Sequence, residues 1–173
     1  MTQTPSNTGA VGQGSENGLQ PEAVFQTPLW IRRVVGFEAI NQEILSHLPA
    51  LRELGGEQRS NDGGWHSPSR LHLDDRLGAI RKTIGNTCAQ CAVTMEFDFS
   101  RFDLVFQEMW LNVNGPGHSN KAHVHPGAFL SGAYYVQVPE LSGNIEFYDP
   151  VAARVASPFS TAAQSAPGAT MLS

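Results

Sequence analysis

Residues 112–150 read Asn-Val-Asn-Gly-Pro-Gly-His-Ser-Asn-Lys-Ala-His-Val-His-Pro-Gly-Ala-Phe-Leu-Ser-Gly-Ala-Tyr-Tyr-Val-Gln-Val-Pro-Glu-Leu-Ser-Gly-Asn-Ile-Glu-Phe-Tyr-Asp-Pro. At the centre of this stretch lies His123-Val124-His125. Side chains alternate along an extended chain, so two histidines at this spacing are expected to point to the same face. Aromatic and β-branched residues then predict a strand over residues 129–138, a turn at residues 140–144 and a second strand over residues 145–148.

The histidine pair admits two interpretations. Two neutral imidazoles on one face can supply two ligands of a mononuclear metal site. The alternative is a strand edge at the surface that carries two solvated histidines. The neighbourhood favours the metal site, because the pair follows a loop rich in Gly, Pro and Asn, and functional residues concentrate on such loops. His118, five residues before His123, makes histidine locally dense.

A larger set of residues carries a family resemblance. These residues are Trp110-Leu-Asn112-Val-Asn114, His123-Val-His125-Pro-Gly-Ala-Phe-Leu-Ser131-Gly-Ala-Tyr134-Tyr135-Val-Gln-Val-Pro and Gly143-Asn-Ile-Glu-Phe-Tyr-Asp149-Pro150. The stretch resembles a family of Fe(II)/2-oxoglutarate-dependent oxygenases with a double-stranded β-helix fold, specifically over residues 110–150 and more loosely over residues 25–173.

The resemblance implies roles for individual residues. His123 and His125 would be iron ligands, with a second histidine where the wider superfamily places an acidic residue. Ser131 and Tyr135 match strand positions that face 2-oxoglutarate, and Asn112 lies on the strand before the site. Tyr134, one residue along the strand, is expected to face the opposite way and to pack in the core.

The sequence also departs from the family pattern. Family members continue with a Phe-Pro-Ser-Trp-Leu-x-His segment and an Arg-containing strand, which supply the distal histidine ligand and the basic partner of 2-oxoglutarate. No histidine follows His125 in this sequence, which ends at Ser173, and Arg154 is the only basic residue after Lys121. We therefore expect a barrel that is incomplete at its C-terminus. Its open edge predicts aggregation, or completion by another chain as in a homo-oligomer.

Composition narrows the class of protein. The chain has 173 residues, which indicates one domain, and its net charge of -5 argues against a nucleic-acid-binding surface. No apolar run approaches the roughly 20 residues that span a bilayer, and the N-terminus lacks a secretory pattern, so we expect a cytoplasmic protein without a membrane partner. Cys88 and Cys91 are predicted to be buried free thiols on a helix.

The expected organisation is a disordered tail over residues 1–22 and an oxygenase-like domain over residues 23–173. Apolar spacing predicts an edge strand at residues 25–35 and helices at residues 37–51, 71–84 and 87–95, the last two separated at Gly85-Asn86 and the last capped by Thr87. Residues 99–113 predict a strand that is apolar on both faces. Beyond residue 150 we expect a short strand at 151–156, a loop at 157–167 and the beginning of an element at 169–172. Trp65 is expected to anchor a loop, and His66 to be exposed or to cap a helix.

The predicted fold class is α+β, with N-terminal helices packed on the sheet of a jelly-roll core. The predicted function is that of an Fe(II)- and 2-oxoglutarate-dependent dioxygenase acting on an unknown small molecule or peptide, in a pocket lined by Trp110, Phe129 and Tyr135. Two alternatives remain open: a non-catalytic, cupin-like metal-binding domain, and an inactive truncated relative. Dependence on 2-oxoglutarate distinguishes the first alternative from an oxygenase.

Overall fold

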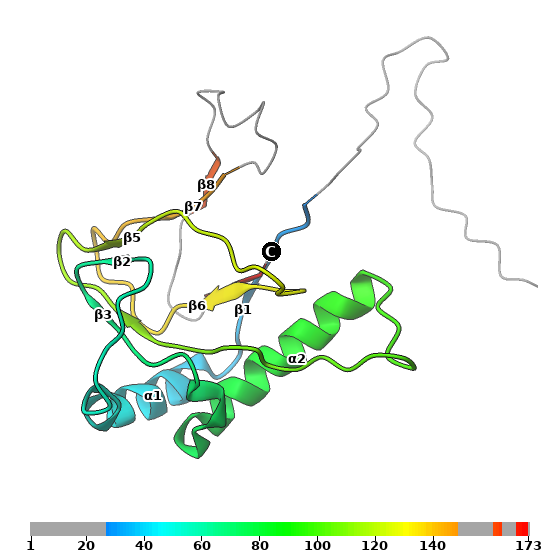
Figure 1. The fold of residues 1–173 in the computed structure, drawn as a ribbon, viewed down its shortest axis with the longest axis horizontal. Helices are drawn as coiled ribbons and strands as arrows, with labels where there is room; N and C mark the ends of the chain where they lie inside the picture. The colour runs from blue at the N-terminus through cyan, green and yellow to red at the C-terminus, as the bar shows by residue number, and fades with distance from the viewer. Residues whose placement is uncertain (1–26, 149–160, 164–168, 173) are drawn as a thin grey trace, which may run out of the picture.

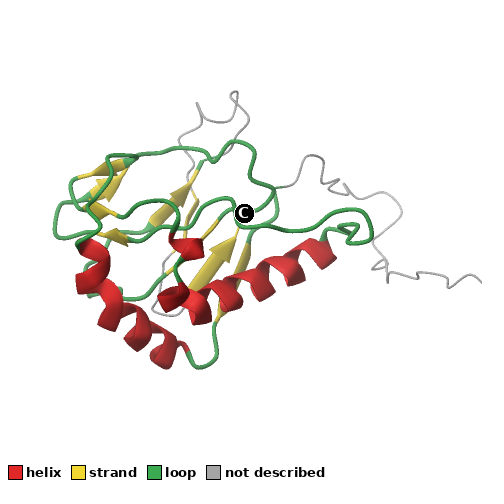
Figure 2. Ribbon diagram, turned by 60° about the horizontal axis from the view of Figure 1, so that its bottom comes forward, coloured by secondary structure: helices red, strands yellow, loops and turns green. Residues whose placement is uncertain are grey.

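The computed structural model describes residues 27–148, 161–163 and 169–172 (Figure 1). The tail expected at residues 1–22 and the strand expected at 151–156 lie outside these residues. Helices and strands are mixed, as predicted, and the two long helices lie on one side of the strands in both views (Figures 1 and 2). The described strands form one three-stranded and three two-stranded sheets, which do not by themselves make up a double-stranded β-helix.

The first helix confirms the prediction from apolar spacing. Helix α1 spans Phe37–Arg52 and begins after Gly36, which has a φ of 72° that favours glycine. Its buried face consists of Asn41, Ile44 and Leu51. These positions are three and seven residues apart, so they lie on one stripe of the helix.

The second helix is continuous, so the predicted break at Gly85-Asn86 is wrong. Two short 3-10 turns, η1 (Leu71–Leu73) and η2 (Asp75–Leu77), lead directly into α2, which spans Gly78–Thr94. A glycine within a helix costs only about 1 kcal/mol relative to alanine, which tertiary packing can offset. A Cβ built on Gly85 would lie 3.6 Å from the Phe106 ring, so this side of the helix is packed.

Two side-chain predictions on α2 have opposite outcomes. Thr87 does not cap a helix: it lies within α2, is buried, and its hydroxyl donates to the Thr83 carbonyl at 2.9 Å. Cys88 and Cys91 are free thiols on the helix, as predicted, but only Cys91 is buried, whereas Cys88 is half-buried. Burial raises the pKa of both thiols, which favours their protonated, less nucleophilic form.

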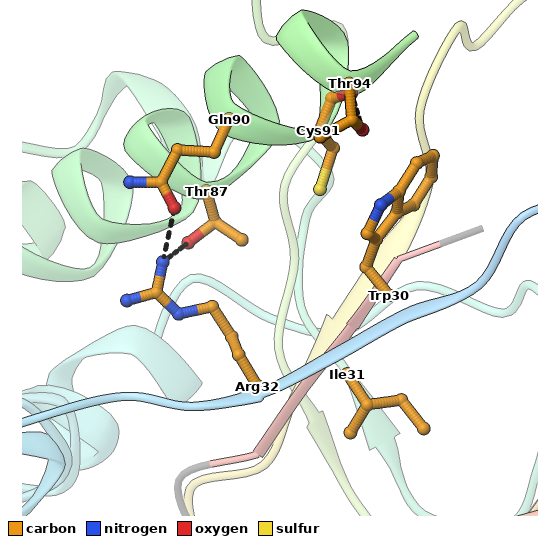
Figure 3. Close-up of a pocket in the computed structure, with 7 residues that line it drawn as sticks. All are labelled: Trp30, Ile31, Arg32, Thr87, Gln90, Cys91 and Thr94. Atoms are coloured by element: carbon orange, nitrogen blue, oxygen red, sulfur yellow. Dashed lines mark hydrogen bonds between the residues drawn. The ribbon is translucent and has the colours of Figure 1, made fainter. Parts of the chain in front are cut away.

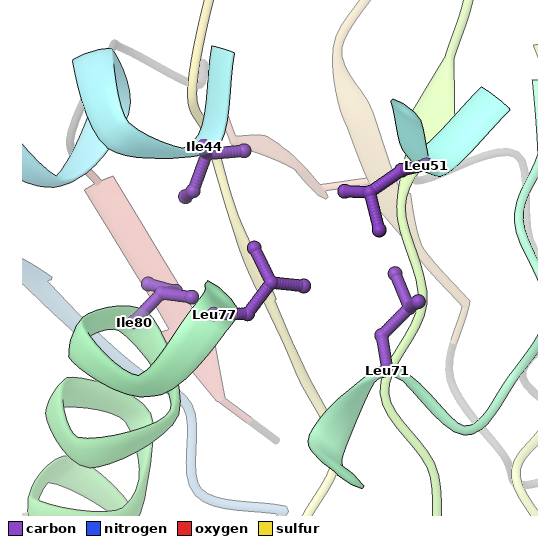
Figure 4. Close-up of a cluster of buried hydrophobic side chains, with 5 residues drawn as sticks. All are labelled: Ile44, Leu51, Leu71, Leu77 and Ile80. Carbon is purple, nitrogen blue, oxygen red and sulfur yellow. The ribbon is translucent and has the colours of Figure 1, made fainter. Parts of the chain in front are cut away.

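The core lies between the two helices and the strands. Five buried side chains form it: Ile44, Leu51, Leu71, Leu77 and Ile80 (Figure 4). Partly buried apolar residues from the strand side, among them Met109, Leu111 and Tyr134, pack against this cluster. The helices and η turns therefore supply the most deeply buried part of the molecule.

The three-stranded sheet joins distant segments in the order β1-β9-β6, with antiparallel pairing throughout. Its strands are β1 (Trp30–Arg33), β9 (Ala169–Leu172) and β6 (Gly132–Tyr134). The first strand lies at the edge of this sheet, as predicted. The prediction of a strand over residues 129–138 is confirmed only for its centre, and residues 169–172 form the middle strand.

An asparagine ties this sheet to α1. The Asn41 Nδ2 donates to the Val136 carbonyl at 2.7 Å, and the Tyr134 hydroxyl donates to Asn41 Oδ1 at 2.7 Å. Tyr134 also packs against the core, as predicted from its position in the strand. Because side chains alternate along a strand, Ser131, Ala133 and Tyr135 face away from the helices.

Three small antiparallel sheets complete the described structure. In them β2 (Asn61–Asp62) pairs with β5 (Ser119–Asn120), β3 (Trp65–His66) with β4 (Asn112–Val113), and β7 (Ile145–Phe147) with β8 (Thr161–Ala163). The second strand predicted at residues 145–148 is therefore confirmed for residues 145–147, although its partner is β8 and not the preceding strand β6. The loop predicted at residues 157–167 is wrong where β8 forms.

The long strand predicted at residues 99–113 is also wrong. Within it β4 is assigned at Asn112–Val113, and Phe102 and Val105 are 54% and 82% exposed. The final residues continue the β3–β4 pairing irregularly, since the Ser67 amide donates to the Leu111 carbonyl while the Leu111 amide donates to Ser67 Oγ. Apolar alternation describes a strand only where a partner supplies backbone hydrogen bonds.

Of the predictions for residues 65 and 66, the first is confirmed and the second is wrong. Trp65 packs against the core and its indole donates to the Gly55 carbonyl at 3.2 Å, which confirms its role as an anchor. His66 is only 3% exposed, so the prediction that it is exposed or capping is wrong. Its ring stacks on Trp110 with centroids 5.5 Å apart, which explains its burial.

Candidate metal centre

The predicted metal ligands lie together on the loop between β5 and β6. The ring centroids of His123 and His125 are 4.9 Å apart, with an angle of 57° between the ring planes. The spacing of two residues thus brings the imidazoles side by side, close enough for one ion to contact both. The histidines themselves lie in an irregular loop, because regular strand pairing begins only at Gly132.

Each of these rings is held through its Nδ1 atom. The Nδ1 of His123 lies 2.7 Å from the Lys121 carbonyl oxygen, and the Nδ1 of His125 is hydrogen-bonded to Ser131 Oγ. A carbonyl oxygen only accepts, so the proton of neutral His123 is on Nδ1 and the lone pair is on Nε2. Metal-ligating histidines typically show this arrangement, in which one nitrogen donates to a protein group and the other binds the ion. This donor chemistry fits a divalent metal.

Trp110 forms one side of the site. Its ring meets His125 edge-on, with centroids 5.3 Å apart, and stacks on the buried His66. Partial burial, followed by the proximity of His123, lowers the pKa of His125, whereas the charge of Glu108 opposes this shift. The lowered pKa favours the neutral imidazole, which is the form that binds metals.

The residues predicted to hold 2-oxoglutarate are only partly gathered around the histidines. Ser131 contacts His125 directly. Tyr135 is half-buried and lies just beyond the end of β6, on the same side of the strand as Ser131 by alternation. Asn112 is exposed in β4, in register with His66, two residues after the tryptophan that contacts His125.

Two supports of the site were not predicted from the sequence. One is the Lys121 carbonyl, a backbone acceptor that no motif displays. The other is the stack of His66 on Trp110, which depends on the pairing of β3 with β4. Trp65 and His66 lie in the looser part of the resemblance, over residues 25–173, which gave neither residue a role at the metal site.

A third protein ligand is not found among the residues that the structure describes. Within residues 27–148, 161–163 and 169–172, no group of three or more His, Cys, Asp or Glu side chains could hold a metal ion. Asp149 and Arg154 lie outside these ranges. The site as described therefore provides two ligands.

A cavity elsewhere in the fold is distinct from this site. It has a volume of about 260 Å³ and lies between β1 and α2, with Arg32 donating to Gln90 Oε1 at 3.0 Å (Figure 3). None of its lining residues is a predicted site residue. Arg32 shares a sheet row with Tyr134 and contacts α2, so this cavity is on the helix-facing side of the sheet, away from Ser131.

Comparison with protein families supports the resemblance. Residues 108–172 match the model of the family described as "Putative 2OG-Fe(II) oxygenase". The family predicted from residues 110–150 is thus confirmed for this segment, which includes both histidines, Ser131 and Tyr135. No curated protein matches the chain.

The match carries general implications only. The family name implies Fe(II) and 2-oxoglutarate, and it indicates an oxygenase of unspecified substrate. Among the described residues, no helix is long and apolar enough to cross a membrane.

Proposed function

We propose that this chain is an Fe(II)- and 2-oxoglutarate-dependent dioxygenase of the hydroxylase type, with His123 and His125 as iron ligands. The observation that supports this most directly is the pair of imidazoles 4.9 Å apart, each engaged through Nδ1, inside the segment that matches the oxygenase family. Two histidines with open positions around the ion agree with the ligand preferences of non-haem iron oxygenases.

The protein's own part in the reaction is binding and orientation. When bound, Fe(II) would supply the oxidative chemistry, in which dioxygen oxidises 2-oxoglutarate to succinate and CO2 and hydroxylates a substrate. His123 and His125 bind in their neutral forms, and their Nδ1 partners hold each ring in one orientation. Trp110 covers one side of His125 and limits the access of water to it.

Ser131 has two roles in this proposal. A hydroxyl has one donor and two acceptor positions, so Ser131 can accept from His125 Nδ1 and donate to a carboxylate of 2-oxoglutarate. Tyr135 and Asn112 are assigned further hydrogen bonds to the same co-substrate. Ser131→Ala should therefore lower the affinity for both the metal and the co-substrate, whereas Asn112→Ala should lower the affinity for the co-substrate only.

An anaerobic titration tests the proposal. Fe(II) and 2-oxoglutarate are added to the purified chain, together and separately, while the visible charge-transfer absorption is followed. We expect a band that requires both components and is lost in His123→Ala. The matched control is His118→Ala, which removes an exposed histidine five residues upstream whose Nδ1 accepts from the Gly115 amide. A band that persists in His123→Ala would refute the ligand assignment.

A second candidate function is a non-catalytic, cupin-like metal-binding domain. It is favoured by the ligand count, since the described residues supply two histidines and no third ligand. Such a site would take Zn(II), Ni(II) or Cu(II) as readily as Fe(II). Metal binding that is unchanged by 2-oxoglutarate, together with no succinate formation in air, would favour this function over the oxygenase.

A further inference from the structure

Four phenylalanines gather beside the loop that carries the histidine pair. Phe97 is central, and its ring centroid lies 4.8 Å from that of Phe99, 6.2 Å from Phe102 and 5.1 Å from Phe129. Three of these rings come from the segment after α2, whereas Phe129 comes from the loop between His125 and β6. We call these four residues the aromatic cluster.

The outer rings of the aromatic cluster remain in contact with water. Phe99, Phe102 and Phe129 are 45%, 54% and 49% exposed. Aromatic rings that serve only to hold two loops together are normally buried, because their apolar area is what stabilises the contact. Contiguous exposed apolar surface on a folded protein commonly marks a place where a ligand binds.

The chain geometry places this surface next to the histidines. The Ala128 amide donates to the His125 carbonyl at 3.2 Å and closes a tight turn, so the Cα atoms of these two residues lie within about 7 Å of each other. Phe129 follows this turn directly, and Ser131, two residues later, returns to hydrogen-bond His125. Phe129 is therefore held between two contacts with a proposed iron ligand.

We propose that the aromatic cluster is the substrate-binding surface of the His123–His125 site and takes an uncharged aromatic ring of the substrate. This inference rests on the oxygenase function proposed above. The planes of Phe99, Phe102 and Phe129 make angles of 63°, 58° and 49° with Phe97. Tilted rings present both edges and faces, which is the arrangement that a further aromatic ring prefers.

Binding of a small aromatic probe tests the inference. The probe is N-acetyl-L-phenylalaninamide and its matched partner is N-acetyl-L-alaninamide, each followed by saturation-transfer NMR with the metal-free chain. We expect transfer to the phenylalanine probe only. Phe99→Ala and Phe102→Ala, which remove half-exposed rings, should each weaken its binding at least fivefold. Tyr148→Ala is the control, because it removes a ring that is 59% exposed and directly follows β7.

A second arm measures proximity to the metal site. Mn(II) and 2-oxoglutarate are added, binding of Mn(II) is followed by loss of its free EPR signal, and relaxation of the probe's ring protons is measured. Faster relaxation that disappears in Phe99→Ala supports the inference. Mn(II) that binds without affecting the probe overturns it, as does equal binding of both probes.

The two proposals can fail separately. If Mn(II) does not bind while the phenylalanine probe still distinguishes the variants, the metal-site function is refuted and the aromatic cluster loses its role as that site's substrate surface. If the chain forms a concentration-dependent dimer that Phe99→Ala abolishes, and the probe does not bind the monomer, the surface is a contact between two copies and the inference is overturned.

Discussion

Asn41 provides the clearest test of how the helices position the site-bearing strand. It is a polar residue on the buried face of α1 and is only 8% exposed. Its amide donates to the Val136 carbonyl and its carbonyl oxygen accepts from the Tyr134 hydroxyl, both at 2.7 Å. Asn41→Ala removes both hydrogen bonds and leaves two polar groups near the core without these partners.

The expected loss follows from these two contacts. A neutral hydrogen bond contributes about 1 kcal/mol net, and a buried group left unsatisfied costs about 1–3 kcal/mol, so Asn41→Ala should lower the free energy of unfolding by about 2–4 kcal/mol. Tyr134→Phe removes only the second bond and should cost about 1 kcal/mol. Because both variants remove that bond, the double variant should lose less than the sum, by about 1 kcal/mol.

Urea unfolding followed by circular dichroism measures all three variants. Ser46→Ala is the control on the same helix, because its exposed hydroxyl donates only to the Glu43 carbonyl within α1. A loss below about 0.5 kcal/mol for Asn41→Ala, the size of a neutral surface change, would refute the contribution assigned to this clamp. Strict additivity of Asn41→Ala and Tyr134→Phe would refute the shared hydrogen bond.

Three further predictions concern the second half of the helical layer. Gly85→Ala should raise the free energy of unfolding by up to about 1 kcal/mol in the same urea assay, because alanine has the higher helix propensity and its Cβ would meet Phe106 at an ordinary contact distance of 3.6 Å. A destabilised Gly85→Ala variant would contradict the packing described. The hydrogen bond from Arg76 lowers the pKa of Asp74 from its ordinary value of 3.8. The ionised carboxylate therefore stabilises the fold above pH 3.8, and this contribution is lost as the pH falls through the pKa that Asp74 has in the folded protein. Asp74→Asn keeps an oxygen that can accept from the Arg76 amide but removes the charge paired with the Arg76 guanidinium, so it should cost up to about 1 kcal/mol at pH 7. The gap to wild type should narrow below pH 3.8, whereas a gap independent of pH would count against the ion pair. Burial raises the pKa of Cys88 and Cys91, so iodoacetamide at pH 8 should label them slowly in the folded chain and rapidly in urea, with equal rates contradicting their burial.

Local patterns in the sequence predicted the structure correctly where the residues of one element determine its conformation. The apolar residues of α1 recur three and four positions apart, and the helix forms within a residue of the predicted bounds. The proximity of His123 and His125 follows from a spacing of two residues, which needs no knowledge of the rest of the chain. The placement of Tyr134 on the core side of its strand follows from the same alternation.

Sequence patterns gave wrong predictions where contacts with a distant segment determine the local structure. Gly85-Asn86 has the composition of a helix end, but packing against Phe106 and the core keeps α2 continuous. Residues 99–113 alternate like a strand, but only the end of this segment is paired to residues 65–71. The earlier residues of the segment instead place Phe99 and Phe102 in the aromatic cluster, a use of apolar side chains that periodicity does not reveal.

The same dependence on distant partners explains why the supports of the site were not foreseen. His66 reaches Trp110 because the strand Trp65–His66 pairs with Asn112–Val113, and Trp110 in turn contacts His125. The strand that follows the histidine loop, β6, is paired to β9, which is also the partner of β1. Thus segments that lie tens of residues before and after the histidine motif hold Trp110 and β6 in place. Trp110 contacts His125, and β6 follows the loop that carries the two imidazoles. A motif identifies the groups that can bind a metal, whereas long-range pairing determines how firmly they are held.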